Sequence, residues 1–230
     1  MRQTISQHDL RHLSPPPKPL LRGYLHAGAA ALMVAGTIVL LARSAQDGPR
    51  QLSLLIYGLS GLVLFGMSAL YHIVTWDTRP RALLRRLDHA NIFLLIAGTY
   101  TPIALNLLAG GWRVGILAAV WGLALSGIAV NLLPLALPRW LSVGLYLLTG
   151  WVALAALPEI ARAVGGGALV VLALGGVLYT LGALAYGFKR PALWPRVFGY
   201  HELFHAFTIA ANAAFFAFML LYVLPAARPA

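Results

Sequence analysis

The sequence predicts an all-α integral membrane protein, a bundle of seven transmembrane helices. Hydrophobic residues make up 60% of the 230 residues and charged residues only 10%, with a mean hydropathy of +0.79. Soluble domains carry about 25% charged residues, so this chain has too few polar side chains to cover a water-facing surface. Its apolar residues also fall into seven separate runs, each near or above the ~20 residues that a helix needs to cross a bilayer.

The first segment, residues 1–22, is polar and basic and contains three consecutive prolines from Pro15, which is typical of a disordered or surface-lying tail. His8 and His12 share a helical spacing, but the nearby prolines favour a solvated tail over a binding site. The next run, 23–43, is too long for the apolar core of a signal peptide. We therefore expect it to be retained as the first membrane helix.

Six further apolar runs follow, with turn residues between them. They lie at about residues 51–75, 88–109, 113–133, 139–157, 167–187 and 201–224. Small residues inside them, such as Gly58, Gly61, Gly66 and Gly175, predict close approach between neighbouring membrane helices. No repeat period is present, and the loops are too short for a second domain.

The distribution of lysine and arginine predicts the orientation in the membrane. Twelve of the 17 fall on the side that holds the first segment and the loops after the second, fourth and sixth spans. Since basic residues accumulate on the cytoplasmic side, we expect a cytoplasmic N-terminus and an external C-terminus in the cell membrane. The predicted organisation is a cytoplasmic tail (1–22), a seven-helix membrane domain (23–224) and a short external tail (225–230). The net charge of +11 then reflects basic loops facing anionic lipid, rather than a nucleic-acid partner.

The stretch that begins at Tyr200 carries the clearest chemical signal. It places His201 and His205 one turn apart, on one face of the helix that opens the last apolar run. Ionisable side chains are costly at a membrane helix unless they are paired or bind a metal. Because the chain contains no cysteine, any metal site must use nitrogen and oxygen ligands.

With the predicted orientation, three helices bring polar groups to one depth. His72 lies about one turn from the cytoplasmic end of the second span, with Ser68 one turn deeper, and Asp88 stands at the start of the third span. His201 and His205 open the seventh. At ~1.5 Å per residue, all five fall within a layer roughly 10 Å thick. Three imidazoles with an open fourth position predict a zinc site in which His72, His201 and His205 are the ligands.

Each of these residues also has a structural interpretation. Asp88 suits the positive N-terminal end of a helix or an ion pair with a neighbouring arginine, and Ser68 suits helix packing. His26 and His89, the remaining histidines of the spans, are best interpreted as interfacial side chains. The metal interpretation therefore depends on the agreement in depth rather than on any single residue.

The spacing His201-Glu202-x-x-His205 also matches the zinc-binding helix of zincin metalloproteases, in which the glutamate is the general base. That site usually takes a third ligand from further along the chain. After His205 the sequence contains no His, Asp, Glu or Cys. Glu202 is also turned about 100° from His201 around the helix, toward lipid headgroups or a loop arginine. We therefore do not favour a protease.

Three segments together resemble the bacterial hemolysin III family, over a stretch that covers all seven spans. They are Ser68-Ala-Leu-Tyr71-His72, the segment from Asp88-His89-Ala-Asn91 to Thr101-Pro102, and His201-Glu-Leu-Phe-His205. That family is related to the progestin and adipoQ receptors, including the adiponectin receptors, and more distantly to alkaline ceramidases. The resemblance implies zinc near the cytoplasmic face on His72, His201 and His205. It also implies that Asp88 holds a zinc-bound water and that Ser68 is the family's serine on the second span.

The physical argument favours hydrolysis. A zinc ion on three neutral imidazoles activates water near neutral pH. Asp88 would orient that water or take its proton, and Ser68 would donate to an oxyanion or hold the same water. A site that opens toward the inner leaflet makes an amide- or ester-linked membrane lipid the natural substrate. The alternative is a lipid-sensing, receptor-like protein with a structural zinc site. A cytolytic pore has less support, because the spans lack the rows of charge that line an aqueous channel.

Overall fold

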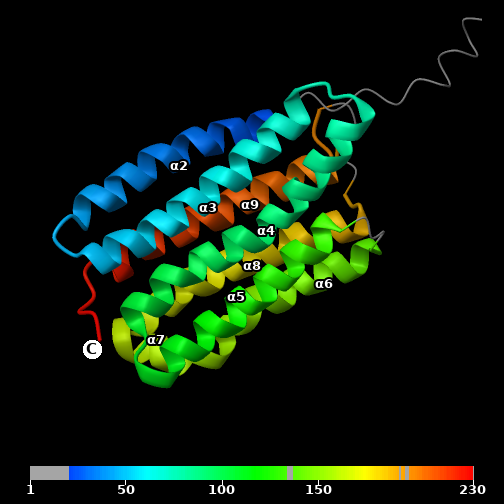
Figure 1. Ribbon diagram of the computed structural model, residues 1–230. Helices are drawn as coiled ribbons and strands as arrows, with labels where there is room; N and C mark the ends of the chain where they lie inside the picture. Colours follow the sequence, from blue (N-terminus) through cyan, green and yellow to red (C-terminus); the bar gives the residue numbers. More distant parts are fainter. Residues whose placement is uncertain (1–20, 134–136, 192, 195–196, 230) are drawn as a thin grey trace, which may run out of the picture.

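The computed structural model describes residues 21–133, 137–191, 193–194 and 197–229, and in these ranges the protein is a bundle of long helices (Figure 1). Seven of them are long and apolar enough to cross a membrane. In chain order the elements are α2 (Tyr24–Arg43), α3 (Gly48–Ile73), α4 (Thr78–Leu107), α5 (Gly110–Leu132), α6 (Arg139–Gly150) with η1 (Trp151–Ala156) and α7 (Leu157–Val164), α8 (Gly166–Phe188), and α9 (Tyr200–Phe218) with η2 (Met219–Val223). The predicted all-α membrane fold is confirmed.

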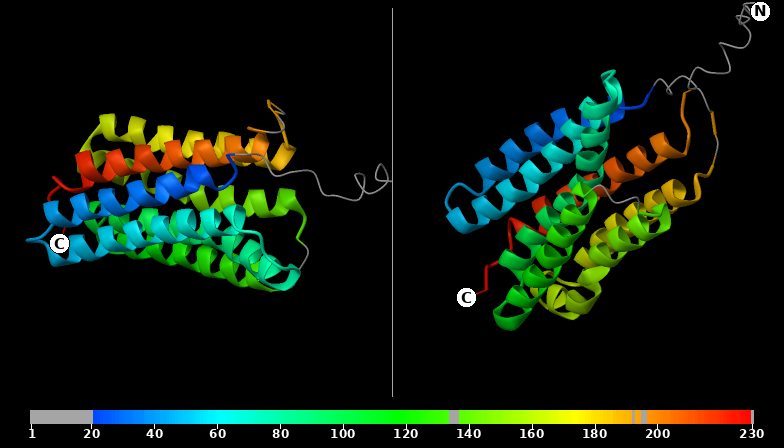
Figure 2. Two further views of the ribbon diagram at one scale, coloured as in Figure 1. Left: turned by 90° about the horizontal axis from the view of Figure 1, so that it is seen from above. Right: turned by 45° about the vertical axis from the view of Figure 1, so that its right-hand side comes forward.

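Consecutive helices run in opposite directions and pack side by side, most extensively α8 with α9, α3 with α4, α4 with α5 and α2 with α3. Helix α9 also contacts α2, so the last span returns to the first. An odd number of crossings places the start of α2 and the last described residues at opposite ends of the bundle (Figure 2). The starts of α2, α4 and α9 and the end of α3 share one end, which is called the metal end below.

Helices α3 and α4 form the centre of the bundle. In their most apolar windows 56% and 72% of the residues are buried, against 22–33% in the other five spans. The outer helices therefore offer most of their surface to lipid. Polar side chains on α3 and α4 are shielded by their neighbours, and these two helices carry Ser68, His72 and Asp88.

Two helix boundaries differ from the prediction because apolarity marks the membrane rather than the helix. Helix α4 begins at Thr78 instead of residue 88, since its arginine-rich first turns continue the same helix beyond the apolar run. The fifth span extends to Val164 instead of residue 157, because a 3₁₀ segment and the short helix α7 continue α6.

Small residues do allow close helix contacts, though not at every predicted position. A Cβ at Gly61 would lie 2.7 Å from Cε of Met33, and one at Gly58 would overlap Thr37, so both glycines let α3 approach α2. The same expectation for Gly66 is wrong, because nothing lies within 4 Å of the place where its Cβ would be.

Candidate metal centre

Helix α3 carries the first two site residues into the protein interior. Ser68 and His72 are spaced four residues apart, so they lie one turn apart on the same face of α3. Their exposed fractions are 2% and 8%. His72 lies in the last turn of α3, which ends at Ile73, so it stands at the depth that the sequence predicts.

Helix α9 carries the other two imidazoles in its first two turns. It begins at Tyr200, where the backbone N–H of Gly199 donates to the Glu202 carboxylate over 2.8 Å. An acidic residue in this position satisfies a free N–H and complements the positive end of the helix dipole. The helix therefore begins one residue before His201. Because His201 and His205 are four residues apart within it, they face the same side.

Glu202 is fully buried, and its carboxylate is committed to structure. Besides Gly199, it accepts from the Nε of Arg22 over 2.6 Å, which ties the chain just before α2 to the start of α9. The expected arginine partner is thus present, whereas the headgroup-facing alternative is wrong. These two bonds hold the carboxylate away from the role of a zincin general base.

Asp88 lies ten residues inside α4, not at its N-terminus. The interpretation that it complements the end of a helix is therefore wrong. Among the described residues its Oδ2 lies 3.7 Å from Nε2 of His72, and no neighbouring arginine forms an ion pair with it. Ser68 and Asp88 line the same small cavity. Asp88 thus joins α4 to the polar face of α3.

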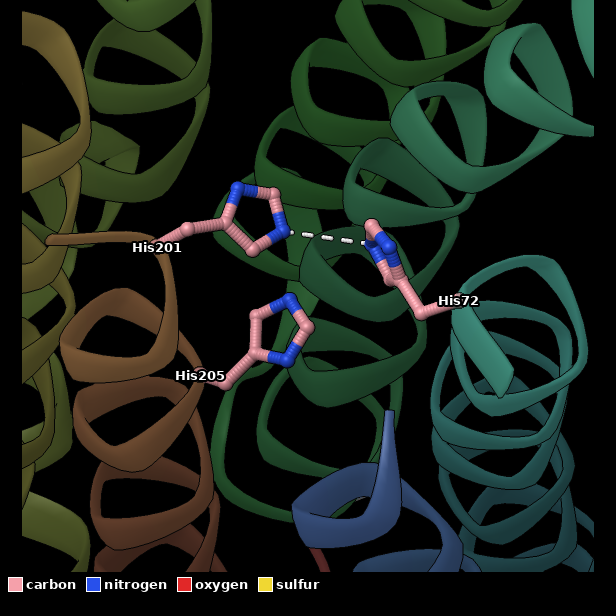
Figure 3. A group of neighbouring side chains, drawn as sticks. All are labelled: His72, His201 and His205. Atoms are coloured by element: carbon pink, nitrogen blue, oxygen red, sulfur yellow. Dashed lines mark hydrogen bonds between the residues drawn. The ribbon is translucent and has the colours of Figure 1, made fainter. Parts of the chain in front are cut away.

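The three predicted ligands converge on one point from two helices (Figure 3). The Nε2 atoms of His72 and His201 are 3.2 Å apart. Tetrahedral zinc with bonds of ~2.0–2.1 Å separates its ligand nitrogens by about 3.3 Å, so this pair already has the spacing of one tetrahedral edge. One nitrogen from each of the three rings lies within 4.8 Å of the others. The three nitrogens are therefore close enough to be candidates for one metal ion, with the His72–His201 pair already at ligand spacing.

His26 belongs to the same cluster, and its interpretation as an interfacial side chain is wrong. Only 2% of it is exposed, and its ring stacks on His205 with centroids 3.7 Å apart and planes 10° apart. Both of its nitrogens, and Nδ1 of His205, are buried without a hydrogen-bond partner among the described residues. Buried polar atoms are nearly always satisfied, so these nitrogens indicate a ligand or water in the site.

His89 is close by but has a different role. Its Nδ1 lies 2.6 Å from the carbonyl oxygen of Arg85, and its Nε2 lies 3.1 Å from the hydroxyl of Tyr186. The ring therefore links α4 to α8 instead of facing the membrane interface. With both nitrogens engaged it is not among the three converging imidazoles, although it lines the same small cavity.

Two adjoining cavities lie between the metal end and the interior of the bundle. A small cavity beside the cluster is lined by Ser68, Asp88, His201, His205 and His26. It shares wall residues with a deeper, almost wholly apolar cavity of about 90 Å³ between α3, α4, α6, α8 and α9. The shared residues are Leu64, Ile92, Tyr146 and Phe204. The polar cluster therefore lies directly at the head of an apolar space.

Similarity to known proteins agrees with this arrangement. A family model described as "Haemolysin-III related" matches residues 16–216, which is most of the chain. The chain belongs to this haemolysin III family. It is 34% identical to the "Hemolysin-3 homolog" of Bacillus subtilis over 170 residues, covering 74% of this chain and 76% of that protein. It is 32% identical to the "Hemolysin-3" of Bacillus cereus over 206 residues, covering 88% and 90% of the two chains.

In this haemolysin III chain the five predicted site residues lie together, while one neighbour was missed. The five are Ser68, His72, Asp88, His201 and His205. The depth argument applied to His26 would have included it, because it stands at the same end of the first span. Because His26 lies near the predicted membrane boundary, it was interpreted as an interfacial side chain.

Proposed function

We propose that the protein is a zinc-dependent hydrolase that cleaves an amide or ester bond in membrane lipids. The observation that carries the proposal is the convergence of three imidazoles, two buried and one half-buried, with Asp88 and Ser68 at the head of an apolar cavity. A hydrolytic centre needs polar groups at the reacting bond, and a lipid needs an apolar space beside them. The bundle offers both in contact.

The donor set suits zinc. All three candidate ligands are imidazoles, and zinc sites with three protein ligands and one open position are catalytic in other proteins. Zinc bound there would lower the pKa of a water molecule to ~7 and polarise a carbonyl group. The proposal is supported by Nδ1 of His205, which is buried without a hydrogen-bond partner among the described residues.

Side chains of the protein would orient the water, accept its proton and hold the substrate. The Asp88 carboxylate lies 3.7 Å from Nε2 of His72, where it can orient a water molecule and accept its proton. The buried Ser68 hydroxyl beside Asp88 would hold the same water or donate to a developing oxyanion. The apolar cavity, which includes Leu64, Ile92 and Phe204, would take the acyl chain and exclude bulk water.

The site would open to the cytoplasmic leaflet, because the basic residues concentrate at the metal end. Reporter fusions test this orientation. A reporter that works only in the cytoplasm should be active at the N-terminus and silent at the C-terminus. Activity at the C-terminus would reverse the orientation and move the proposed substrate to the other leaflet.

The decisive experiment is lipid hydrolysis by the purified protein in bilayers that contain ceramides and phospholipids. Fatty-acid release should stop when a chelator removes the metal and return when zinc is restored. If metal-loaded protein releases no fatty acid from any lipid, and chelation only lowers its melting temperature, the hydrolase proposal fails.

One observation favours a second candidate, a lipid-sensing membrane protein with a structural zinc site. Asp88 is near enough to His72 to become a fourth ligand after a small shift, and a closed shell is typical of structural zinc. In that case Asp88→Asn would lose zinc together with the histidine variants. In a hydrolase it would keep zinc and lose turnover.

A further inference from the structure

The metal end carries a second, mostly polar cavity that opens outward from the histidine cluster. Its wall shares His72, Asp88, His89 and His201 with the site already described. The rest of the wall is made of cationic and hydroxyl-bearing side chains: Arg22, Arg81, Arg85, Arg139, Tyr71, Tyr186 and Tyr200. This cavity is called the mouth below.

Positive charge in the mouth exceeds negative charge. Among the described residues of its wall Asp88 is the sole carboxylate, and Arg22 is neutralised outside it by Glu202. Arg139 stacks over Tyr186, 4.8 Å from the ring centroid. Neither Arg81 nor Arg85 forms an ion pair within the described parts of the chain. The guanidinium groups of Arg81 and Arg85 are thus available to bind a ligand.

The placement of Arg81 and Arg85, both exposed, carries a modest electrostatic cost that an anion would remove. They are spaced four residues apart on α4, and like charges at this spacing repel each other. Arg81 also lies in the first turn of α4, which begins at Thr78, where the helix dipole disfavours a cation. Asp77, just before the helix, forms no ion pair with either residue in the described structure.

Among the described residues, most arginines at the opposite end of the bundle have partners within the protein, and the exposed Arg43, which has none, lines neither the mouth nor the cavities beside the histidines. Arg162 pairs with Glu159, and Arg228 with Asp47. Arg113 donates to the carbonyl oxygens of Leu108 and Pro229. A preference for basic residues on the cytoplasmic side explains the sign of the charge at the metal end. It does not explain why two unpaired arginines line one cavity beside the histidines.

We propose that the mouth binds the phosphate group of a phosphate-bearing lipid, with Arg81 and Arg85 as its main partners. Guanidinium groups form charge-assisted, often bidentate, hydrogen bonds with phosphate oxygens. The hydroxyl groups of Tyr71 and Tyr200, in the same wall, add further donors. The ligand class follows from the charge of the mouth, and its lipid nature follows from the apolar cavity on the other side of the cluster.

The proposal deepens the proposed function, on which it rests for its consequence. In a glycerophospholipid the phosphate and the nearest acyl ester sit on neighbouring glycerol carbons. A phosphate in the mouth therefore puts an acyl ester beside His72, Asp88 and His201, with the acyl chain directed into the apolar cavity. Ceramide carries no phosphate and leaves the arginines without a partner.

Native mass spectrometry of the full chain in detergent tests the proposal with three probes: dioleoyl phosphatidate, ceramide and inorganic phosphate. Phosphatidate should bind at least about tenfold more tightly than ceramide, because hydrogen bonds to charged groups contribute that much. The double variant Arg81→Gln/Arg85→Gln should lose this preference. The matched control Arg79→Gln/Arg190→Gln removes two exposed arginines of the same end that lie outside the mouth, and it should keep the preference. Melting temperatures of both variants check that they fold.

Three outcomes would overturn the proposal: equal binding of ceramide and phosphatidate, equal loss in both double variants, or saturation by inorganic phosphate with no gain from the lipid. The last would assign the mouth to a free oxyanion. Failure of the proposed function is separate, since binding needs no turnover. Protein that prefers phosphatidate but hydrolyses nothing supports the mouth and refutes the hydrolase, whereas hydrolysis of ceramide without any phosphate preference refutes only the mouth.

Discussion

The two ends of the bundle treat buried polar groups in opposite ways. At the end away from the histidines, the Arg50 guanidinium donates to the carbonyl oxygens of Leu224 and Ala226 and to the side chain of Asn106. Asn106 in turn donates to the Ser53 hydroxyl over 3.0 Å. At the metal end, three buried imidazole nitrogens have no partner within the described chain.

The difference separates structural polar groups from functional ones. A buried polar atom without a partner costs ~1–3 kcal/mol, so a fold gains nothing by keeping one unless a ligand compensates for it. The Arg50 network satisfies itself and fastens α3 to the end of the chain. The histidine cluster remains incomplete, which is the state expected of a site that binds a metal, water and substrate.

The largest expected effect follows from removing a ligand. His72→Ala and His205→Ala should each lose most of the zinc that the purified wild-type protein carries, about one ion per chain, because two imidazoles do not retain it. Metal analysis of protein purified without added zinc measures this. The control is His89→Ala, which should keep its zinc because both ring nitrogens bond within the protein. Full occupancy in both ligand variants would refute the site.

A smaller loss is expected when Asp88 is changed and the ligands remain. Asp88→Asn keeps the size of the side chain but removes the charge that would take a proton from water. Turnover should fall ~10²–10⁴-fold, the usual contribution of a general base, while zinc content stays near that of the wild type. Metal analysis and lipid hydrolysis on the same preparations separate the two effects. Zinc loss equal to that of His72→Ala would show that Asp88 is itself a ligand.

The opposite end should respond in stability alone. Arg50→Met removes the donor to the carbonyl oxygens of Leu224 and Ala226 and to the side-chain oxygen of Asn106. Because these acceptors are then unsatisfied, the free energy of unfolding should fall by on the order of 3 kcal/mol. Denaturation in mixed micelles measures the change, and zinc per folded chain should stay the same. Loss of zinc from the folded variant would mean that the two ends are coupled.

Sequence reasoning predicted the fold well because membrane helices can be recognised from their length and apolarity. Five of the seven spans end within about three residues of their predicted limits. It failed where a helix extends beyond the membrane, as at the arginine-rich start of α4. Hydropathy does not report that Thr78 to Leu87 continues a helix, because such turns lie outside the apolar run.

The site was predictable in part because depth along a helix is set by residue number. That rule brought His72, Asp88 and His201 to one layer before any contact was known. It does not report which way a side chain faces around its helix. The stacking of His26 on His205 and the pairing of Glu202 with Arg22 depend on helix rotation and packing, so they emerge only in three dimensions.

The smallest expected effect comes from His26, and it tests the comparison of the two ends most directly. Phenylalanine keeps a ring that stacks on His205 and meets the edge of Phe65, whose centroid is 5.1 Å from that of His26, but it lacks both unpartnered nitrogens. If those nitrogens serve the site, His26→Phe should leave the melting temperature of the zinc-free protein unchanged or slightly raised. Zinc affinity should weaken about tenfold, as for other groups that support metal ligands.

The control His89→Phe should give the opposite pattern, because the nitrogens of His89 are satisfied. The Tyr186 hydroxyl loses its partner in this variant, so stability falls while zinc affinity holds. Competition with a chelator gives the affinities, and thermal unfolding with and without zinc gives the stabilities. A His26→Phe protein that melts earlier without zinc and binds zinc as tightly as the wild type would make this histidine structural, and the unsatisfied nitrogens would then no longer distinguish one end of the bundle from the other.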